Sequence, residues 1–360
     1  MKVLIVFNHF QVQDGVARTA IGMANALAAK DVQVVLKPLF KFDRSMTERL
    51  DPRVRIRPVF RCYFRGFPRL IGLAPKKLLN RWIVDDSFDI EVGLCMTLPI
   101  QIIAAYPDRK GGHEAIRFAW MHGYDIGLSL CREYERIGKV ICVSKFNYEK
   151  LKENALGKFE TDYAYNLVDD SAIREKGKGA ARIRRTDGIQ FVSVGRMSPE
   201  KGYMRLLDIC KKLVIQGYHF SLWLIGDGPQ RRELENYGRG LNLEGVVRFL
   251  GAQSNPHAYT AKADVFICSS FDEGYSTACT EAIMLGIPVL TTPVSGGKEI
   301  IEEAEAGLLV GMEDEELYYG LKTILDHPGY VEEWKGKLLE TRERFSYKNR
   351  AQKLFDIFGI

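Results

Sequence analysis

Short apolar runs alternate with segments of helical periodicity along the whole 360-residue chain. An apolar run at residues 2–7 leads into a polar loop with Gly15, and residues 16–29 then carry apolar side chains at helical spacing. A second apolar run follows at residues 32–37. Strand, glycine-bearing loop, helix and strand, in this order, open a doubly wound α/β domain. Further strands of this half are predicted at residues 89–95, 115–121, 139–143 and 161–165, and a helix at residues 144–154.

The same alternation begins again near residue 189. Strands are predicted at residues 189–194, 220–225, 246–250, 263–268 and 288–291. Each ends in a loop that holds a glycine, a charged residue or both, so we expect a ligand crevice along the carboxyl edge of this second sheet. The charged, aperiodic residues 174–188 are expected to form the interdomain linker or a loop just after it. From residue 313 onward the chain is expected to be helical.

The loop after the fourth strand of this half carries the strongest local signal. Glu273 lies in a glycine-marked turn, and Ser276 and Thr277 are suited to cap a helix that continues through Glu281. A helix N-terminus presents free N–H groups and partial positive charge, so it suits an anion. The two glutamates can then bind hydroxyl groups on either side of that anion. In isolation, two such glutamates are more often a solvated loop acid and a helix-surface acid.

Composition limits the class of protein. Hydrophobic residues make up 46% of the chain and charged residues 27%, which is typical of soluble globular proteins, and the length favours two domains. The first residues continue directly into patterned sequence, so we expect a first strand there and no signal peptide. The seven cysteines include no Cys-x-x-Cys pair and are predicted to be small core residues of a reduced, cytoplasmic protein.

Positive charge is concentrated in one segment, residues 37–82, which we expect to be irregular in structure. The net charge is +5, and between residues 37 and 82 thirteen lysines and arginines face three acids and interleave with aromatic residues. One interpretation is a set of solvated arginines whose aromatic neighbours pack inward. The other is a patch that contacts anionic lipid or an anionic acceptor. Nucleic-acid binding has no supporting motif, and the loop at Gly15 lacks the three spaced glycines of a dinucleotide site.

An ordered series of motifs between residues 189 and 310 is far more specific than any one of them. It strongly resembles the nucleotide-sugar-dependent glycosyltransferases of family 4. The motifs are Gly195-Arg196, Glu200-Lys201-Gly202, Gly226-Asp227-Gly228-Pro229, Phe249-Leu250-Gly251, Glu273-Gly274, Glu281-Ala282 and Gly296 to Glu299. In the first half the resemblance is looser. There it rests on Gly15, His122, Ser144 and the turn from Asn166 to Asp169.

This resemblance implies the GT-B fold, an α/β architecture of two Rossmann-like, doubly wound parallel-sheet domains that face a central cleft. Residues 1–168 would form the acceptor-binding domain and residues 169–345 the nucleotide-sugar-binding domain. The C-terminal helix, residues 346–360, would pack back onto the first domain. The family usually has a glycine pair in the first loop, whereas this chain has Gly15 preceded by Asp14.

The resemblance also implies roles for the matching residues. Arg196 and Lys201 are expected to hold the donor diphosphate, since fixed cations stabilise a departing pyrophosphate without a metal. Glu273 is expected to bind hydroxyls of the donor sugar. Glu281 is expected to bind the ribose. The remaining implied site residues are His122 beside the donor sugar, Gly15 beside the phosphates, Gly226, Gly251, Gly274, Tyr275, Ser276 and Thr277. In isolation, loop cations such as Arg196 and Lys201 would more often face solvent.

The activity implied is retaining transfer of a hexose-type sugar from a nucleoside-diphosphate sugar, UDP being favoured, to an acceptor hydroxyl. A lipid-linked glycan of cell-surface polysaccharide assembly is the acceptor hypothesis, with the enzyme cytoplasmic or peripheral on the inner face of the membrane. No cofactor or metal is expected, and the chain has no Asp-x-Asp. A sugar-nucleotide epimerase of similar fold and a non-catalytic nucleotide-sugar-binding subunit remain the alternatives.

Overall fold

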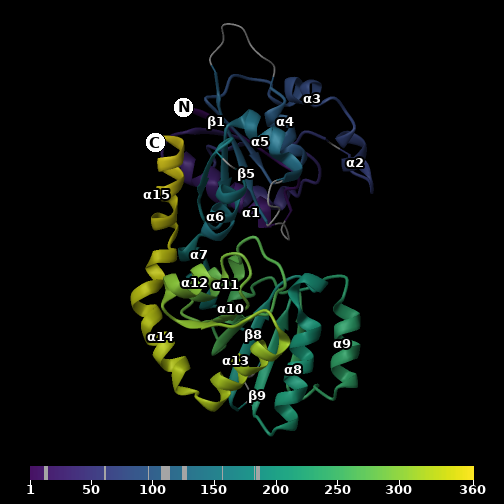
Figure 1. The fold of residues 1–360 in the computed structure, drawn as a ribbon, viewed down its shortest axis with the longest axis vertical. Helices are drawn as coiled ribbons and strands as arrows, with labels where there is room; N and C mark the ends of the chain where they lie inside the picture. The colour runs from purple at the N-terminus through teal and green to yellow at the C-terminus, as the bar shows by residue number, and fades with distance from the viewer. Residues whose placement is uncertain are drawn as a thin grey trace. The chain divides into compact units, whose positions relative to one another are not determined.

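Two compact units make up the chain. The computed structural model describes residues 1–11, 15–60, 62–95, 97–106, 114–123, 128–155, 157–181, 183 and 187–360. Met1–Val168 and Arg350–Ile360 form unit 1, and Asp169–Asn349 form unit 2 (Figure 1). Each unit is built around its own parallel sheet.

The sheet of unit 1 has seven strands in the order β3-β2-β1-β4-β5-β6-β7. Every neighbouring pair is parallel. In chain order the strands are β1 (Lys2–Phe7), β2 (Gln33–Pro38), β3 (Arg55–Ile56), β4 (Ile90–Leu94), β5 (Ile116–Met121), β6 (Lys139–Cys142) and β7 (Glu160–Tyr163). Parallel pairing brings all seven carboxyl ends to one edge, where ligands bind in folds of this class.

Helices cover both faces of this sheet because side chains alternate between its faces. Leu4 and Val6 face a core that also includes residues of α3 (Lys76–Ile83), α4 (Leu98–Ala104), α5 (Cys131–Ile137) and α6 (Lys145–Ala155). Helix α1 (Gly15–Ala28) contacts β1 and β2. Phe118 of β5 stacks on Phe358 of the C-terminal helix α15 (Tyr347–Phe358), with ring centroids 5.2 Å apart. The second half of α15 is therefore packed into unit 1.

The sheet of unit 2 has six parallel strands in the order β10-β9-β8-β11-β12-β13. The strands are β8 (Ile189–Val194), β9 (Phe220–Ile225), β10 (Val247–Gly251), β11 (Val265–Cys268), β12 (Val289–Thr291) and β13 (Gly307–Leu309). Leu222 and Leu224 face α8 (Tyr203–Ile215), α9 (Arg231–Gly240) and α13 (Asp314–Asp326). Trp223 points to the opposite face and contacts Tyr259 of α10 (His257–Thr260). Figure 1 shows α8, α9 and α13 alongside β8 and β9.

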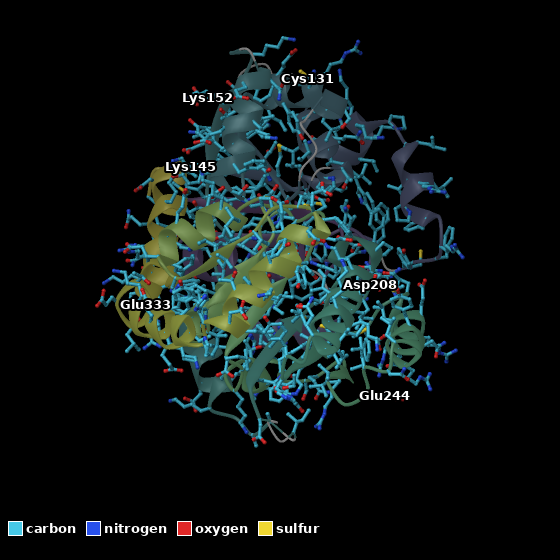
Figure 2. All side chains as sticks on the ribbon, turned by 60° about the horizontal axis from the view of Figure 1, so that its bottom comes forward. Cys131, Lys145, Lys152, Asp208, Glu244 and Glu333 are labelled. Carbon is cyan, nitrogen blue, oxygen red and sulfur yellow. The ribbon has the colours of Figure 1, made fainter. Side chains whose placement is uncertain are left out.

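The remaining helices complete the two units. They are α2 (Phe67–Gly72), α7 (Asp170–Gly177), α11 (Thr277–Met284), α12 (Gly297–Ala304) and α14 (Gly329–Thr341), with short 3₁₀ turns η1 (Arg44–Arg49), η2 (Leu128–Leu130), η3 (Pro199–Lys201) and η4 (Arg342–Phe345). Charged side chains such as Lys145 and Lys152 of α6 and Glu333 of α14 are exposed (Figure 2).

Three segments differ from the sequence prediction. Residues 37–82, expected to be irregular, contain η1, β3, α2 and α3, which are too short for a periodic signal. Residues 174–188 were predicted to be loop, but α7 occupies their start because the Asp169 side chain accepts from Ala172 N and caps it. Strand β13 has three residues and was missed. Within the described part of the chain, no helix combines the length and apolarity that crossing a membrane requires.

Candidate functional site

The loops that follow β8 and β11 meet at the carboxyl edge of the unit 2 sheet. Gly202, with φ of +66°, lies so close to the second loop that a Cβ on it would stand 2.2 Å from the Ser269 carbonyl oxygen. The Ser269 hydroxyl donates to the Lys201 carbonyl at 2.9 Å, and Phe271 N donates to the Glu200 carbonyl at 2.7 Å. Only glycine tolerates both this backbone conformation and this contact.

A buried arginine donates hydrogen bonds to the backbone of the second loop. Arg205 of α8 is 5% exposed, and its guanidinium donates to the carbonyl of Ser269 through Nε at 3.1 Å and Nη2 at 2.6 Å. Nη2 also donates to the Ser270 carbonyl at 3.2 Å, and Nη1 to the Met312 carbonyl at 2.6 Å. Burial lowers the pKa of Arg205 from its ordinary value. The planar guanidinium thus fixes the backbone just before Glu273, because its several N–H donors can bind three carbonyl groups at once.

Lys201 and Glu273 form an ion pair across these loops. The Lys201 Nζ lies 2.5 Å from Glu273 Oε1, and their side chains are 21% and 15% exposed. The Ser270 hydroxyl donates to the same oxygen at 3.0 Å. Burial disfavours the charged lysine, but the Glu273 carboxylate outweighs burial, so the pKa of Lys201 is raised. The ammonium therefore stays charged at neutral pH in a largely desolvated position.

Glycines bring the loops after β8 and β9 into contact. A Cβ on Gly226, with φ of +142°, would stand 1.9 Å from the Gly195 carbonyl oxygen, and one on Gly228 would stand 2.3 Å from the Met197 carbonyl. Gly226 N donates to the Gly251 carbonyl at 2.9 Å. A Cβ on Gly195 would lie 3.6 Å from Lys201 Cε, so the lysine chain passes over this backbone. Arg196, the next residue, is exposed.

Helix α11 begins beside the ion pair and carries Glu281. Ser276 is its N-cap and accepts from Cys279 N, as the sequence predicted. Glu281 is 8% exposed, so it is not the surface acid of the alternative interpretation. Its Oε2 lies 3.2 Å from Nε2 of His257 in α10. His257 Nδ1 is buried and has no hydrogen-bond partner among the described residues.

The loop that links β11 to α11 also touches the start of α12. Tyr275 is 6% exposed, and a Cβ on Gly296, with φ of +79°, would stand 2.4 Å from its ring. Gly296 is the N-cap residue of α12. Tyr275 is therefore packed against the late glycine motif, and the chain from Glu273 to Thr277 is held at both ends.

Two predicted site residues belong to unit 1. His122 follows β5, and its Nε2 is buried without a hydrogen-bond partner in the part of the chain that the structure describes. Burial lowers the His122 pKa to about 4, so the imidazole is neutral at pH 7. Gly15 is the first residue of α1, and a Cβ there would meet nothing within 4 Å. Asp14 lies outside the described residues.

The structure thus brings some of the predicted residues into contact and places others on the same loops without contact. It pairs Lys201 with Glu273, packs the Gly226 and Gly251 loops together, and places Arg196 on the loop that carries Lys201. Sequence reasoning missed Arg205, His257 and Ser270. The Ser-Ser pair before the loop was a readable signal for Ser270, whereas nothing in the local sequence marks the other two. Among the described residues, no group of three or more His, Cys, Asp and Glu side chains could hold a metal ion.

Comparison with known proteins identifies the family. The family profile described as "Glycosyl transferases group 1" matches residues 180–352, which hold every motif of the series described above. Residues 180–352, just under half of the chain, match this family. The chain is a glycosyltransferase, and the resemblance inferred from the sequence is confirmed.

Relatives and solved structures agree with this assignment. The chain is 24% identical to the lipopolysaccharide core biosynthesis glycosyltransferase LpsD of Rhizobium meliloti, over 99% of this chain and 98% of LpsD. It is 29% identical to N-acetylgalactosamine-N,N'-diacetylbacillosaminyl-diphospho-undecaprenol 4-alpha-N-acetylgalactosaminyltransferase of Campylobacter jejuni, over 62% of this chain and 58% of that enzyme. The structure of Anabaena HepE in complex with UDP and glucose superposes with a TM-score of 0.72 at 17% identity, covering 100% of this chain and 99% of HepE. This likeness shows the fold, so the predicted GT-B architecture with two parallel α/β sheets is confirmed.

Proposed function

We propose that this glycosyltransferase moves a hexose-type sugar from UDP to an acceptor hydroxyl and retains the configuration at the anomeric carbon. The observation that carries the proposal is the Lys201–Glu273 pair, a charged lysine and a carboxylate held together at the carboxyl edge of the unit 2 sheet. The UDP and glucose bound to HepE, a protein of the same fold, support this choice of donor.

The roles of the side chains follow from their charge and position. Lys201, with Arg196 from the same loop, neutralises the diphosphate as negative charge builds on it. Glu273 accepts hydrogen bonds from hydroxyls of the transferred sugar. Glu281 accepts hydrogen bonds from the ribose, and His257 holds its carboxylate in position. Backbone N–H groups between Gly274 and Thr277, at the start of α11, face the sugar and phosphate.

The reaction exchanges one C–O bond for another. The bond between the anomeric carbon and the diphosphate oxygen breaks, and a bond from the acceptor oxygen to the same face of that carbon forms. The acceptor proton passes to the departing phosphate oxygen, so no side chain of the protein acts as a covalent nucleophile. His122 of unit 1, with its buried and unpaired Nε2, is assigned to a hydroxyl of the donor sugar.

The acceptor assigned to the enzyme is a lipid-linked glycan of cell-surface polysaccharide assembly. The roles named for LpsD and for the Campylobacter enzyme, whose name includes a diphospho-undecaprenol carrier, support this class. Unit 1 is assigned to the acceptor and unit 2 to the nucleotide sugar. The enzyme would then work at the cytoplasmic face of the membrane.

An exposed apolar and basic surface on α2 and α3 supports peripheral membrane contact. Leu73, Leu78 and Trp82 are 83%, 60% and 55% exposed. The neighbouring face of α3, about 100° around the helix, is buried through Leu79 and Ile83, so the apolar surface of this short helix extends beyond its buried face. Arginines and lysines of the same segment suit anionic headgroups, and an apolar side chain among basic ones is the usual interfacial arrangement.

Donor binding is tested by thermal shift with UDP-, GDP-, ADP- and TDP-glucose, because a ligand that binds only the folded protein raises its melting temperature. UDP-glucose should give the largest shift, and no shift with any of the four would overturn the proposal. Transfer is then measured on undecaprenyl-diphosphate-linked glycans. Conversion of the donor sugar to its epimer without acceptor would favour the epimerase instead.

Membrane contact is tested separately by sedimentation with phosphatidylglycerol and phosphatidylcholine vesicles. The Leu78→Ser/Trp82→Ser variant should lose binding to the anionic vesicles. Leu339→Ser is the matched control, since Leu339 on α14 is 66% exposed. Equal binding by all three proteins would contradict the contact.

A further inference from the structure

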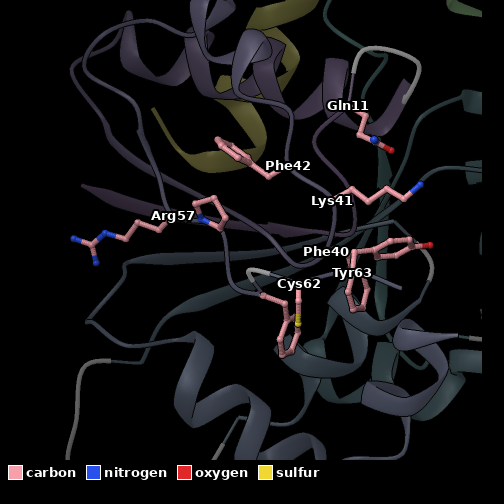
Figure 3. A pocket seen from close by; sticks show the side chains of 9 residues that line it. Gln11, Phe40, Lys41, Phe42, Arg57, Cys62 and Tyr63 are labelled. Atoms are coloured by element: carbon pink, nitrogen blue, oxygen red, sulfur yellow. The ribbon is translucent and has the colours of Figure 1, made fainter. Parts of the chain in front are cut away.

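Unit 1 has a pocket at the carboxyl edge of its first three strands. The pocket encloses about 720 Å³ and is lined by Gln11, Phe40, Lys41, Phe42, Arg57, Pro58, Phe60, Cys62 and Tyr63 (Figure 3). Gln11 lies on the loop after β1, residues 40–42 follow β2, and residues 57–63 follow β3. A doubly wound sheet binds its ligands at this edge.

Backbone hydrogen bonds make the floor of this pocket rigid. Phe40 N donates to the Asn8 carbonyl at 2.8 Å and Phe60 N donates to the Leu39 carbonyl at 3.0 Å, so strand-like pairing continues past the ends of β1, β2 and β3. Phe10 N donates to the Lys41 carbonyl at 2.8 Å. A rigid floor holds the side chains above it in place before a ligand arrives, which lowers the entropy cost of binding.

Aromatic rings form the walls. Phe40 is buried and stacks on Phe60, with centroids 5.7 Å apart and an interplanar angle of 12°. Phe42 and Tyr63 are 37% and 42% exposed, so a face of each ring remains available to a ligand. Exposed aromatic faces with an apolar body suit the C–H-rich face of a sugar ring, and Tyr63 adds a hydroxyl that can bond to it.

One lysine gives the pocket its charge. The Lys41 Nζ lies 4.7 Å from the Tyr63 ring centroid, and no carboxylate lies within ion-pair distance of it among the described residues. Arg57 differs, because its Nη1 lies 3.8 Å from Asp85 Oδ2. Figure 3 shows Lys41, Gln11 and Tyr63 on the same side of the pocket and Arg57 on the other. The uncompensated positive charge therefore sits beside the exposed tyrosine.

We propose that this pocket binds an anionic saccharide unit of the acceptor. Its ring stacks on Tyr63 or Phe42, and its carboxylate or phosphate ester pairs with the Lys41 ammonium. Three donors of the ammonium remain available above the tyrosine ring, and Gln11 offers an amide to a ring hydroxyl. The identification of this sugar as part of the acceptor rests on the proposed function, whereas the binding itself does not.

Cys62 offers a reporter inside the pocket. It is an exposed free cysteine, and Cys131 on α5 is a half-buried one that serves as an internal reference. The full-length protein is treated briefly with N-ethylmaleimide, and modification of both residues is measured by peptide mass spectrometry. Glucose 6-phosphate, glucuronate, glucose and inorganic phosphate are added in turn at about 10 mM, a concentration that detects ligands with millimolar dissociation constants.

Glucose 6-phosphate or glucuronate should slow modification of Cys62 about threefold, as expected for a ligand at twice its dissociation constant. Whichever of the two protects identifies the anionic group. Cys131 should react at an unchanged rate. Lys41→Ala should abolish protection, whereas Lys152→Ala should retain it. Lys152 also lies over a tyrosine of unit 1, with its Nζ 5.6 Å from the Tyr148 ring centroid.

Other outcomes overturn the inference. Equal protection by glucose would show that the ligand needs no anionic group. Equal protection by inorganic phosphate would show that the pocket binds an anion and does not require a sugar ring. Protection that survives in Lys41→Ala would place the ligand elsewhere. The UDP-glucose thermal shift separates this inference from the proposed function: it should be unchanged in Lys41→Ala. If the shift is absent from wild type while Cys62 is protected, the pocket stands and the donor assignment fails.

Discussion

The Nζ of Lys201 lies 2.5 Å from Oε1 of Glu273, so the cation assigned to the diphosphate is already paired with the carboxylate assigned to the sugar. Donor binding must therefore weaken an ion pair that neutralises the Lys201 ammonium in the free protein. A diphosphate competes with Glu273 for Lys201 and weakens their ion pair. Hydrogen bonds from the sugar hydroxyls to Glu273 then replace part of that interaction. This coupling favours the intact nucleotide sugar over the free nucleotide.

Replacing Glu273 should separate these two effects. Glu273→Gln removes the competing carboxylate, so we expect UDP to bind several-fold tighter, while transfer falls by about 10²-fold or more because the sugar loses its charged acceptor. Calorimetry measures the affinity for UDP, and a transfer assay measures the rate of sugar transfer. Glu315→Gln on α13 is the control for the lost charge. Weaker UDP binding by Glu273→Gln would show that the carboxylate does not compete with the nucleotide.

Gly202 should be intolerant of a side chain for two separable reasons. Gly202→Ala adds left-handed backbone strain and a Cβ 2.2 Å from the Ser269 carbonyl, and we expect it to cost roughly 2–4 kcal/mol of unfolding free energy. Gly217→Ala carries the strain alone, since Gly217 has φ of +84° and nothing within 4 Å, and should cost about 1 kcal/mol. Denaturant unfolding compares the two. Equal costs would mean that the two loops do not constrain each other.

His257 should act on the nucleotide only through Glu281. His257→Ala frees the carboxylate that lies 3.2 Å from its Nε2, so we expect the affinity for UDP to fall about tenfold, the value of one hydrogen bond to a charged group. The affinity for 2',3'-dideoxy-UDP, which lacks the ribose hydroxyls, should not change between wild type and variant. A parallel loss for both ligands would indicate a general structural effect of the substitution.

The neutral His122 should make stability depend on pH. Its pKa is lowered from 6.5 to about 4, so between these values the unfolded chain binds more protons and acid favours unfolding. Acidification from pH 7 to pH 4 should therefore cost wild type up to about 3 kcal/mol more than it costs His122→Asn. Denaturant unfolding at several pH values measures this, with His219→Asn at an exposed position as the control for the substitution. Parallel pH curves for wild type and His122→Asn would contradict the burial of this imidazole.

Much of this architecture can be read from the chain because parallel strands end at one edge. The strand boundaries at residues 2–7, 189–194 and 220–225 agree with the structure, since each is an apolar run closed by a polar or glycine residue. The same logic put Lys201 and Glu273 in loops along one edge of the second sheet. It could not show that they pair, because that distance depends on how Arg205 and Gly202 fix the backbone.

The contacts that sequence reasoning missed depend on packing between distant residues. His257 reaches Glu281 across the interface of α10 and α11, and neither residue has a local pattern that points to the other. Helices α2 and α3 have six and eight residues, and α3 exposes apolar side chains, so neither gives the one-sided periodicity of a surface helix. Hydrophobic patterning assigns apolar side chains to the buried face of a helix, so it misplaces an apolar side chain that is exposed, such as Trp82.

The proposed donor site depends on the positive charge of Lys201. Its pKa is raised, since the pull of Glu273 exceeds the cost of burial, so the pair is intact below the ordinary lysine pKa of 10.5 and is lost only as pH rises above it. Titration calorimetry of UDP into wild type, Lys201→Met and the control Lys212→Met, near pH 7.5, tests this charge directly. We predict that Lys201→Met binds UDP at least tenfold more weakly while Lys212→Met binds as wild type does. Equal UDP affinity in all three proteins would contradict the assignment of the diphosphate to Lys201.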